Sequence, residues 1–162
     1  MLPTVPGCPR VRLATPVDRD EIIAMCMELH GENALFPVEM ACVHETVDRA
    51  LRGDNALIGV VGDAQAEGMI YLQLSRMWYS RAVFIEELFN YVRPKFRAST
   101  NSQDLIAFSK AVSDMTEMLL LIGVLSNIRT EAKVRLYRKA LGAPAGAYFV
   151  HAPAHSAATK AA

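Results

Sequence analysis

The sequence has 162 residues, 52% of them hydrophobic, which is the size of one ordinary domain with a substantial core. Lysine plus arginine and aspartate plus glutamate are equal at 17 each, so the formal net charge is zero. A neutral chain lacks the electrostatic signature of binding to nucleic acid or to an anionic membrane, and we expect neither partner.

Three features of the sequence predict a cytoplasmic protein. Residues 1–9 hold three prolines and a glycine, which predicts an irregular lead-in rather than a signal peptide. The longest uninterrupted apolar run, 118–125, is too short to cross a bilayer. Cys8, Cys26 and Cys42 are odd in number and lack close spacing, so they predict neither a disulfide framework nor a zinc site. Cys26 and Cys42 are interpreted as small buried side chains.

A single domain is predicted over residues 10–152, and it begins with a strand and a helix. Alternation in residues 11–14 favours the strand. The helix start lies at Thr15, Pro16 and Asp18, which suit the cap, the first helical position and the capping-box acid. One face of this helix is apolar at helical spacing and comprises Ile22, Met25, Cys26 and Leu29.

The first helix is expected to end at Gly31, and a second helix is predicted over residues 38–52. The apolar face of the second helix comprises Met40, Val43, Val47, Ala50 and Leu51. Strands are then predicted over residues 56–61, 69–74 and 82–92, and short turns allow them to pair with one another.

The rest of the domain predicts two helices and two strands. A helix is expected over residues 102–117, with an apolar face of Leu105, Phe108, Val112 and Met115. Residues 118–125 are apolar on both faces, as is typical of a central strand. A last helix capped by Thr130 is predicted over residues 131–141, and a final strand over 147–150.

This order of elements predicts the sheet. The helix between strands 82–92 and 118–125 is a crossover, and a crossover makes the two strands it joins parallel. The earlier strands are joined by short turns, so the sheet is mixed and the fold is α/β or α+β.

The alanine-rich end of the sequence, 153–162, is expected to be a disordered tail. His151 and His155 are four residues apart, but Pro153 between them argues against the helix that a metal-binding pair would need. The sequence therefore predicts no metal site.

A candidate anion site lies where strand 82–92 leads into helix 102–117. The first N–H groups of a helix have no partner within the helix and, with the helix dipole, favour an anion such as phosphate. Side-chain donors and positive charges gather in the same segment, at Arg93, Lys95, Arg97, Ser99, Thr100 and Ser102.

Two segments of the sequence resemble the GCN5-related N-acetyltransferases. Residues 92–97 read Val-Arg-Pro-Lys-Phe-Arg, similar to the family pattern V-x-P-x-Y/F-R, and Arg97 then takes the first position of Q/R-x-x-G-x-G/A. Thr100 and Ser102 stand where that pattern has its small glycine-type residues, as in variants of phage or prophage type. Residues 134–142 resemble the family's closing helix with its Leu-Tyr pair, and the resemblance covers residues 11–150.

The resemblance implies a mixed, twisted sheet of about six to seven strands with about four helices, in which strands 82–92 and 118–125 splay apart. It implies that acetyl-CoA lies in that opening, held by Tyr91, Val92, Arg97, Ala98, Ser99, Thr100, Asn101, Ser102 and Asn127. An amine, of a small molecule or a protein, would attack the thioester directly. The replacement of both glycines keeps an alternative open, a catalytically degenerate acyl-CoA-binding or assembly module of the same fold.

The resemblance also implies catalytic residues. Tyr137 matches the family's general acid, although it also fits an apolar stripe on its helix. Glu86 stands in the register of the base used by histone-type members, and Glu87 is the alternative on the opposite face, beside Ile85, Phe89 and Tyr91. An exposed or ion-paired role for both glutamates stays open.

The segment before strand 82–92 is where the family often lines its acceptor cleft. Here it holds Trp78, Tyr79 and Arg81, which are also compatible with a plain surface loop. The resemblance further allows a homodimer.

Overall fold

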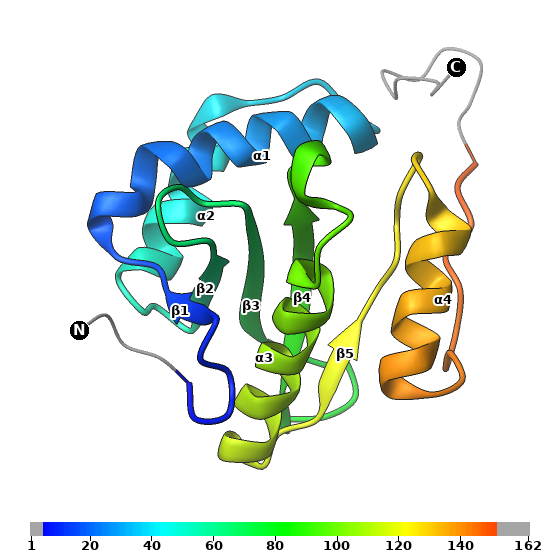
Figure 1. Ribbon diagram of the computed structural model, residues 1–162. Coiled ribbons are helices and arrows are strands. Elements are labelled where there is room, and N and C mark those ends of the chain that lie inside the picture. Colours follow the sequence, from blue (N-terminus) through cyan, green and yellow to red (C-terminus); the bar gives the residue numbers. More distant parts are fainter. Residues whose placement is uncertain (1–4, 152–162) are drawn as a thin grey trace.

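The computed structural model describes residues 5–151, in which one five-stranded sheet is flanked by four α-helices (Figure 1). The strands are β1 (Val11–Leu13), β2 (Ala56–Val61), β3 (Gly68–Arg76), β4 (Val83–Val92) and β5 (Leu120–Ile122). The helices are α1 (Arg19–Asn33), α2 (Met40–Leu51), α3 (Asn101–Thr116) and α4 (Thr130–Leu141), with short 3-10 turns at Pro16–Asp18 and Pro94–Phe96. The strands lie in chain order, antiparallel from β1 to β4 and parallel between β4 and β5, so the predicted mixed sheet is confirmed.

Two apolar cores fill the two faces of this sheet. Helices α1 and α2 cover one face, where their buried residues Ile22, Met25 and Val47 pack against β2 and β3. Helix α3 covers the other face through Leu105 and Phe108, and it lies in front of the sheet in Figure 1. Helix α4 stands on the α3 side, beside the outer edge of β5.

The predicted start of the first helix is confirmed. Pro16–Asp18 form a 3-10 turn that leads directly into α1, and the Asp18 carboxylate accepts the Thr15 backbone N–H at 2.7 Å. The predicted end at Gly31 is wrong, because α1 continues to Asn33. Gly31 keeps an ordinary negative φ within the helix, so its position requires no glycine.

A β-bulge changes which side chains share a face of β4. Tyr71 of β3 pairs with Phe89, whereas Leu72 pairs with Glu87, so Leu88 is the extra residue. Before the bulge, Ile85 and Glu87 point to the α3 face, and after it Phe89 packs on the α1/α2 face. The predicted common face of Glu87, Ile85, Phe89 and Tyr91 is therefore wrong, since simple alternation breaks at Leu88.

The predicted splay of β4 and β5 is confirmed, but the β5 end of the sheet is shorter than expected. Pairing joins Ile85–Glu87 to Leu120–Ile122 and then stops. Residues 118–125 are not a central strand, because β5 is three residues long and half-buried at the sheet edge. Residues 147–150 form no strand, and Phe149 is 95% exposed. The described chain thus has five strands instead of six to seven, since nothing within it pairs with the outer edge of β5.

Several predicted side-chain positions also differ from the structure. Met40 and Met115 lie at helix ends and are exposed, as is Cys42, because α2 buries only residues of its second half and α3 buries none beyond Val112. Thr130 is the first residue of α4 rather than its cap, since Arg129 takes the capping position with a left-handed backbone.

No helix within residues 5–151 is long and apolar enough to cross a membrane. Within the same residues, no three histidine, cysteine, aspartate or glutamate side chains gather as metal ligands. The predicted tail at 153–162 and His155 lie outside the described residues.

Candidate active site

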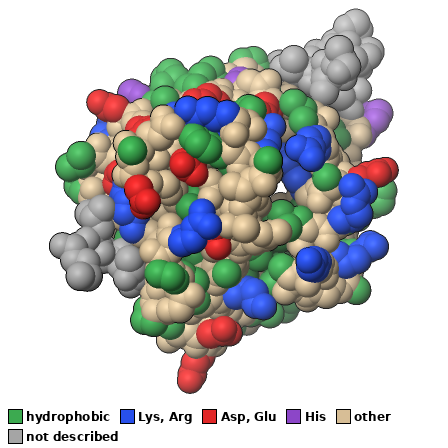
Figure 2. All heavy atoms as spheres, viewed as in Figure 1, with side chains coloured by type: hydrophobic (Ala, Val, Ile, Leu, Met, Phe, Trp, Pro, Cys, Tyr) green, Lys and Arg blue, Asp and Glu red, His purple; other side chains and the backbone are tan. Residues whose placement is uncertain are grey.

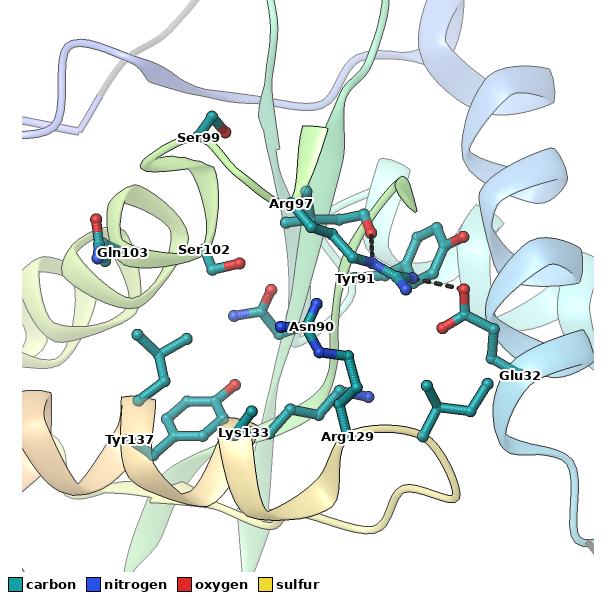
Figure 3. A pocket seen from close by; sticks show the side chains of 14 residues that line it. Glu32, Asn90, Tyr91, Arg97, Ser99, Ser102, Gln103, Arg129, Lys133 and Tyr137 are labelled. Atoms are coloured by element: carbon teal, nitrogen blue, oxygen red, sulfur yellow. Dashed lines mark hydrogen bonds and ion pairs between the residues drawn. The ribbon is translucent and has the colours of Figure 1, made fainter. Parts of the chain in front are cut away.

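A cavity of about 270 Å³ opens where β4 and β5 diverge (Figure 3). It lies between the end of β4, the start of α3, the start of α4 and the last turn of α1. The lining residues are Glu32, Asn90, Tyr91, Val92, Arg97, Ser99, Ser102, Gln103, Ile128, Arg129, Ala132, Lys133, Leu136 and Tyr137. The predicted site is thus partly assembled: Tyr91, Val92, Arg97, Ser99, Ser102 and Tyr137 line one cavity.

The wall formed by β4 turns backbone groups of Val92 toward this cavity. The Arg93 N–H donates to Glu67 beside β3, and the Tyr91 carbonyl lies only 2.8 Å from where a Cβ on Gly68 would sit. Backbone groups alternate along a strand, so those of Val92 face the other way, toward the opening. The Val92 carbonyl accepts the Arg97 Nε–H at 2.8 Å, which anchors that side chain at the cavity. Of the two residues predicted to offer backbone groups, the structure turns Val92 toward the opening and Tyr91 toward β3.

The start of α3 offers free donors. The first helical hydrogen bond runs from the Asp104 N–H to the Thr100 carbonyl at 2.9 Å. Within residues 5–151, the backbone N–H groups of Ser102 and Gln103 have no acceptor, and both residues line the cavity. No residue from Arg97 to Ser102 has a positive φ, so this loop holds its shape without the glycines of the family pattern.

Two side chains of the same segment, Thr100 and Asn101, are held by distant residues, and of the two only Asn101 is buried. Asn101 is fully buried and donates to Glu67 at 2.7 Å, while Arg10 donates to Asn101 at 3.1 Å and to the Thr100 hydroxyl at 2.8 Å. Because their side chains are held in this network, Thr100 and Asn101 do not line the cavity, and neither does Ala98.

Positive charge dominates the cavity. Arg97, Arg129 and Lys133 line it against a single acid, Glu32, which accepts Arg97 Nη2 at 2.5 Å. Figure 2 shows lysine and arginine side chains gathered around the hollow beside α4. Burial lowers the pKa of the Lys133 ammonium, whose Nζ donates to the Ser126 hydroxyl at 2.6 Å. A cavity with these donors suits an anion of several charges, such as a phosphate ester.

The Tyr137 hydroxyl meets the Glu87 carboxylate deep beside this cavity, at 2.7 Å to one oxygen and 2.9 Å to the other. Glu87 is only 7% exposed, and burial raises its pKa to about 7 while the hydrogen bond from Tyr137 opposes the shift. Burial, and then the charge of Glu87, raise the pKa of the Tyr137 phenol well above its usual value. Both changes favour the protonated forms of the pair.

Glu86 lies on the other face of β4. It accepts Gln73 Nε2 at 2.9 Å, and Gln73 Oε1 accepts Arg49 Nη2 at 2.6 Å. Arg49 also donates to the Tyr71 hydroxyl at 3.1 Å. The two neighbouring glutamates therefore serve separate networks on opposite faces of the sheet.

The remaining predicted residues lie away from the cavity. Asn127 is held against the end of α1, since its backbone N–H donates to Asn33 at 3.1 Å. Trp78 is 95% exposed and Tyr79 is 70% exposed on the β3–β4 hairpin, with Arg81 exposed nearby. Their position is that of a surface loop.

Sequence reasoning missed one wall of the cavity. Its missed members, Arg129 at the cap of α4 and Ala132, Lys133 and Leu136 within it, recur at helical spacing with the predicted Tyr137. That stripe, which is neither wholly apolar nor wholly polar, was the available signal. Glu32 and Gln103 carried no comparable signal.

Comparison with known proteins identifies the fold. No family model matches the sequence, and no curated protein matches it. Solved structures match almost its full length, among them the apo aminoglycoside 6'-N-acetyltransferase AAC(6')-IG of Acinetobacter haemolyticus, with a TM-score of 0.67 and 11% identity over 90% of this chain and 99% of that one. The chain has the fold of the GCN5-related N-acetyltransferases. The predicted fold is confirmed.

Two further solved structures share this fold, and one of them holds a CoA conjugate. An acetyltransferase of Trypanosoma brucei matches with a TM-score of 0.65 and 14% identity, over 88% of this chain and 97% of that one. AAC(6')-Iy, bound to the bisubstrate analogue CoA-S-monomethyl-acetylneamine, matches with a TM-score of 0.68 and 11% identity, over 88% and 96%. Proteins with this N-acetyltransferase fold thus include one that carries a CoA conjugate.

Proposed function

We propose that this protein transfers an acetyl group from acetyl-CoA to an amine by direct attack. One observation carries the proposal: a cationic cavity at the divergence of β4 and β5 begins at the free N–H groups of α3 and reaches the hydroxyl of Tyr137. The fold, shared with acetyltransferases that include a CoA-bound structure, supports it.

Acetyl-CoA would use the two ends of the cavity differently. The N–H groups of Ser102 and Gln103, with Arg129 and Lys133, suit the phosphates, because helix starts and cations both favour anions. The backbone N–H of Val92, which faces away from β3, suits an amide oxygen of the pantetheine arm as an added strand would, while Arg97 holds the Val92 carbonyl. The thioester would then lie toward Tyr137.

The reaction needs a base and an acid. The amine nitrogen attacks the thioester carbonyl, the C–S bond breaks, a base removes the ammonium proton, and an acid protonates the CoA thiolate. We assign the acid to Tyr137, which stays protonated because its pKa is raised. We assign the base to Glu86 from the register that the resemblance implies, because Glu87 is already bound to Tyr137.

The acceptor is an amine, and relatives by fold supply a starting panel. AAC(6')-Iy was captured with an acetylneamine conjugate, so aminoglycosides belong in the panel beside polyamines and peptide amines. The three free cysteines are compatible with a cytoplasmic enzyme, which is part of this proposal.

A thermal-shift titration with acetyl-CoA tests binding. We expect the melting temperature to rise, because a ligand that binds only the native state stabilises it. Lys133→Ala should weaken binding by about tenfold, the loss of one charge-assisted contact. Lys139→Ala is the matched control, since Lys139 lies on the same helix and is exposed. The absence of any shift at millimolar acetyl-CoA would defeat the proposal.

Turnover separates an enzyme from a degenerate binding module. With the amine panel, release of free CoA thiol should be detected, and Tyr137→Phe should reduce it by about 10²-fold while acetyl-CoA binding persists. Glu86→Gln should reduce it as well. Binding without turnover on any amine would instead establish the binding or assembly module.

A further inference from the structure

We propose that Glu87 is a positioning residue that decides when Tyr137 can give up its proton: the hydroxyl serves as an acid only while the Glu87 carboxyl is itself protonated. The inference rests on the proposed acetyl transfer and adds to it a second residue and a pH dependence. It follows from the contacts of one buried pair.

The Glu87 carboxylate and the Tyr137 hydroxyl have only one proton between them while Glu87 is ionised. Both Glu87 carboxyl oxygens lie within hydrogen-bond distance of a single hydroxyl, and the carboxyl group has no other hydrogen-bond partner within residues 5–151. An ionised carboxylate only accepts hydrogen bonds, and a phenol carries one proton. While Glu87 is ionised, the Tyr137 proton is therefore directed at Glu87 and away from the cavity.

No cation offsets the charge of Glu87. Of the charged groups on the surrounding elements, Glu86 points to the opposite face of β4, Lys110 of α3 donates to the Ala140 carbonyl, and Lys133 of α4 donates to Ser126. None of the ion pairs formed within residues 5–151 includes Glu87.

The other groups around Glu87 are uncharged. Leu72 of β3 and Ile122 of β5 are its strand partners, and Asn90 reaches the same tyrosine hydroxyl. An isolated charge in such surroundings is costly, which favours the neutral acid. In agreement, the pKa of Glu87 is raised to about 7.

The doubly protonated pair can donate into the cavity. A protonated Glu87 donates to the tyrosine oxygen, so the hydroxyl proton is free to turn toward the cavity that Tyr137 lines. When the C–S bond breaks, the electron pair stays on sulfur and the Tyr137 proton passes to it. The Glu87 proton then passes to the tyrosine oxygen. The products are a thiol, an intact phenol and a Glu87 carboxylate, which water reprotonates.

The pH profile of kcat, measured on the chemical step in single-turnover experiments, tests the proposal. Above the pKa of Glu87, wild-type kcat should fall about tenfold per pH unit as the two-proton pair disappears. Glu87→Gln keeps the size and polarity of the side chain but does not titrate, so this alkaline decline should vanish while activity remains. Glu87→Leu should lose about 10²-fold, as Tyr137→Phe does.

Glu45→Gln is the control, because Glu45 is exposed on α2, far from the cavity, and should keep the wild-type profile. A Glu87→Gln variant that folds normally by circular dichroism but retains the alkaline decline would overturn the proposal. So would a Glu87→Gln variant as inactive as Tyr137→Phe.

Infrared difference spectroscopy tests the protonation of Glu87 independently of the proposed acetyl transfer. The protonated carboxyl band of Glu87 should disappear between about pH 5 and about pH 9 in the wild type and be absent from Glu87→Gln. Turnover without that band overturns the role of Glu87 alone. The band without turnover on any amine overturns the proposed acetyl transfer, and with it the role of Glu87 in it.

Discussion

Two regions of this molecule differ in how firmly they are packed, and the cavity lies between them. Every buried apolar side chain within the described chain falls between Val5 and Val112. From residue 113 to 151, β5 is half-buried, α4 has no buried residue, and the segment after α4 is exposed. One wall of the cavity is thus part of a close-packed body, whereas the other is held by few contacts. A ligand bound between the two regions should therefore stabilise the second, loosely packed region more than the first.

Two buried carboxylates of the N-terminal body, one inside it and one facing α4, are stabilised in opposite ways. In the N-terminal body, Asp18 accepts Arg12 at 2.6 and 2.8 Å, and this hydrogen-bonded pairing lowers the pKa of Asp18 to about 2. Under α4, Glu87 meets only a neutral hydroxyl, and burial raises its pKa to about 7. A structural acid is kept ionised by a partner, whereas an acid kept neutral near pH 7 can take part in proton transfer.

The largest loss of stability is expected from a substitution in the close-packed N-terminal region. Phe108→Ala removes a fully buried ring from the α3 core and should cost about 3–5 kcal/mol of unfolding free energy. Val134→Ala, on half-buried α4, should cost about 1 kcal/mol. Urea unfolding measures both losses. Equal losses would show that α4 is as tightly packed as α3.

Glu87 should make the protein less stable as the pH rises from about 4.5 to about 7. Its folded pKa is raised, so its contribution is complete below the ordinary pKa of 4.5 and is lost as pH rises through about 7. The loss should reach about 3 kcal/mol. Comparing wild type with Glu87→Gln from pH 4 to pH 9, by urea unfolding, measures it. If the gap between the two proteins stays constant over this range, Glu87 does not titrate as described.

Asp18 should act in the opposite direction. Its folded pKa is lowered, so its contribution is present above the ordinary value of 3.8 and is lost as pH falls through about 2. The expected size is about 2 kcal/mol, because the side chain is largely buried in its ion pair. Urea unfolding of Asp18→Asn between pH 5 and pH 2 should no longer show this fall in unfolding free energy. If the variant still shows it, a group other than Asp18 is responsible.

Two glycine substitutions give the smallest and most closely matched comparison. A Cβ on Gly59 would lie 2.7 Å from the buried ring of Phe108, so Gly59→Ala should cost about 1–3 kcal/mol. A Cβ on Gly123, just after β5, would lie 2.9 Å from Tyr148, which is 67% exposed and free to move aside. Gly123→Ala should therefore change the unfolding free energy by less than about 0.5 kcal/mol. Similar losses would contradict the loose packing of the second region.

Much of the fold was predictable from local patterns. Apolar runs between turn residues located β2, β3 and β4 to within about two residues, and helical spacing located all four helices, because these patterns reflect which side chains each element buries. The position of the cavity was predictable as well, since the end of β4, the start of α3 and Tyr137 are marked by short sequence signatures.

Other features depended on contacts between distant residues. Apolar residues at 118–125 predict a strand, but its length depends on a neighbour, and no strand lies beyond β5 in residues 5–151. Thr100 and Asn101 have the chemistry of ligand-binding residues, yet contacts with distant residues turn them away from the cavity. Arg10 donates to the exposed Thr100 hydroxyl, and Glu67 accepts from the buried Asn101 side chain.

By itself, the sequence determined the order of elements, the crossover that makes β4 and β5 parallel, and a tyrosine on the helix that faces them. Only the tertiary structure decided which glutamate meets Tyr137. The Leu88 bulge leaves Glu87 on the α3 side and Phe89 on the other, a change of face that two-residue alternation cannot show. The bulge is defined by pairing with β3, so the environment of Glu87 is a property of the sheet rather than of its own strand.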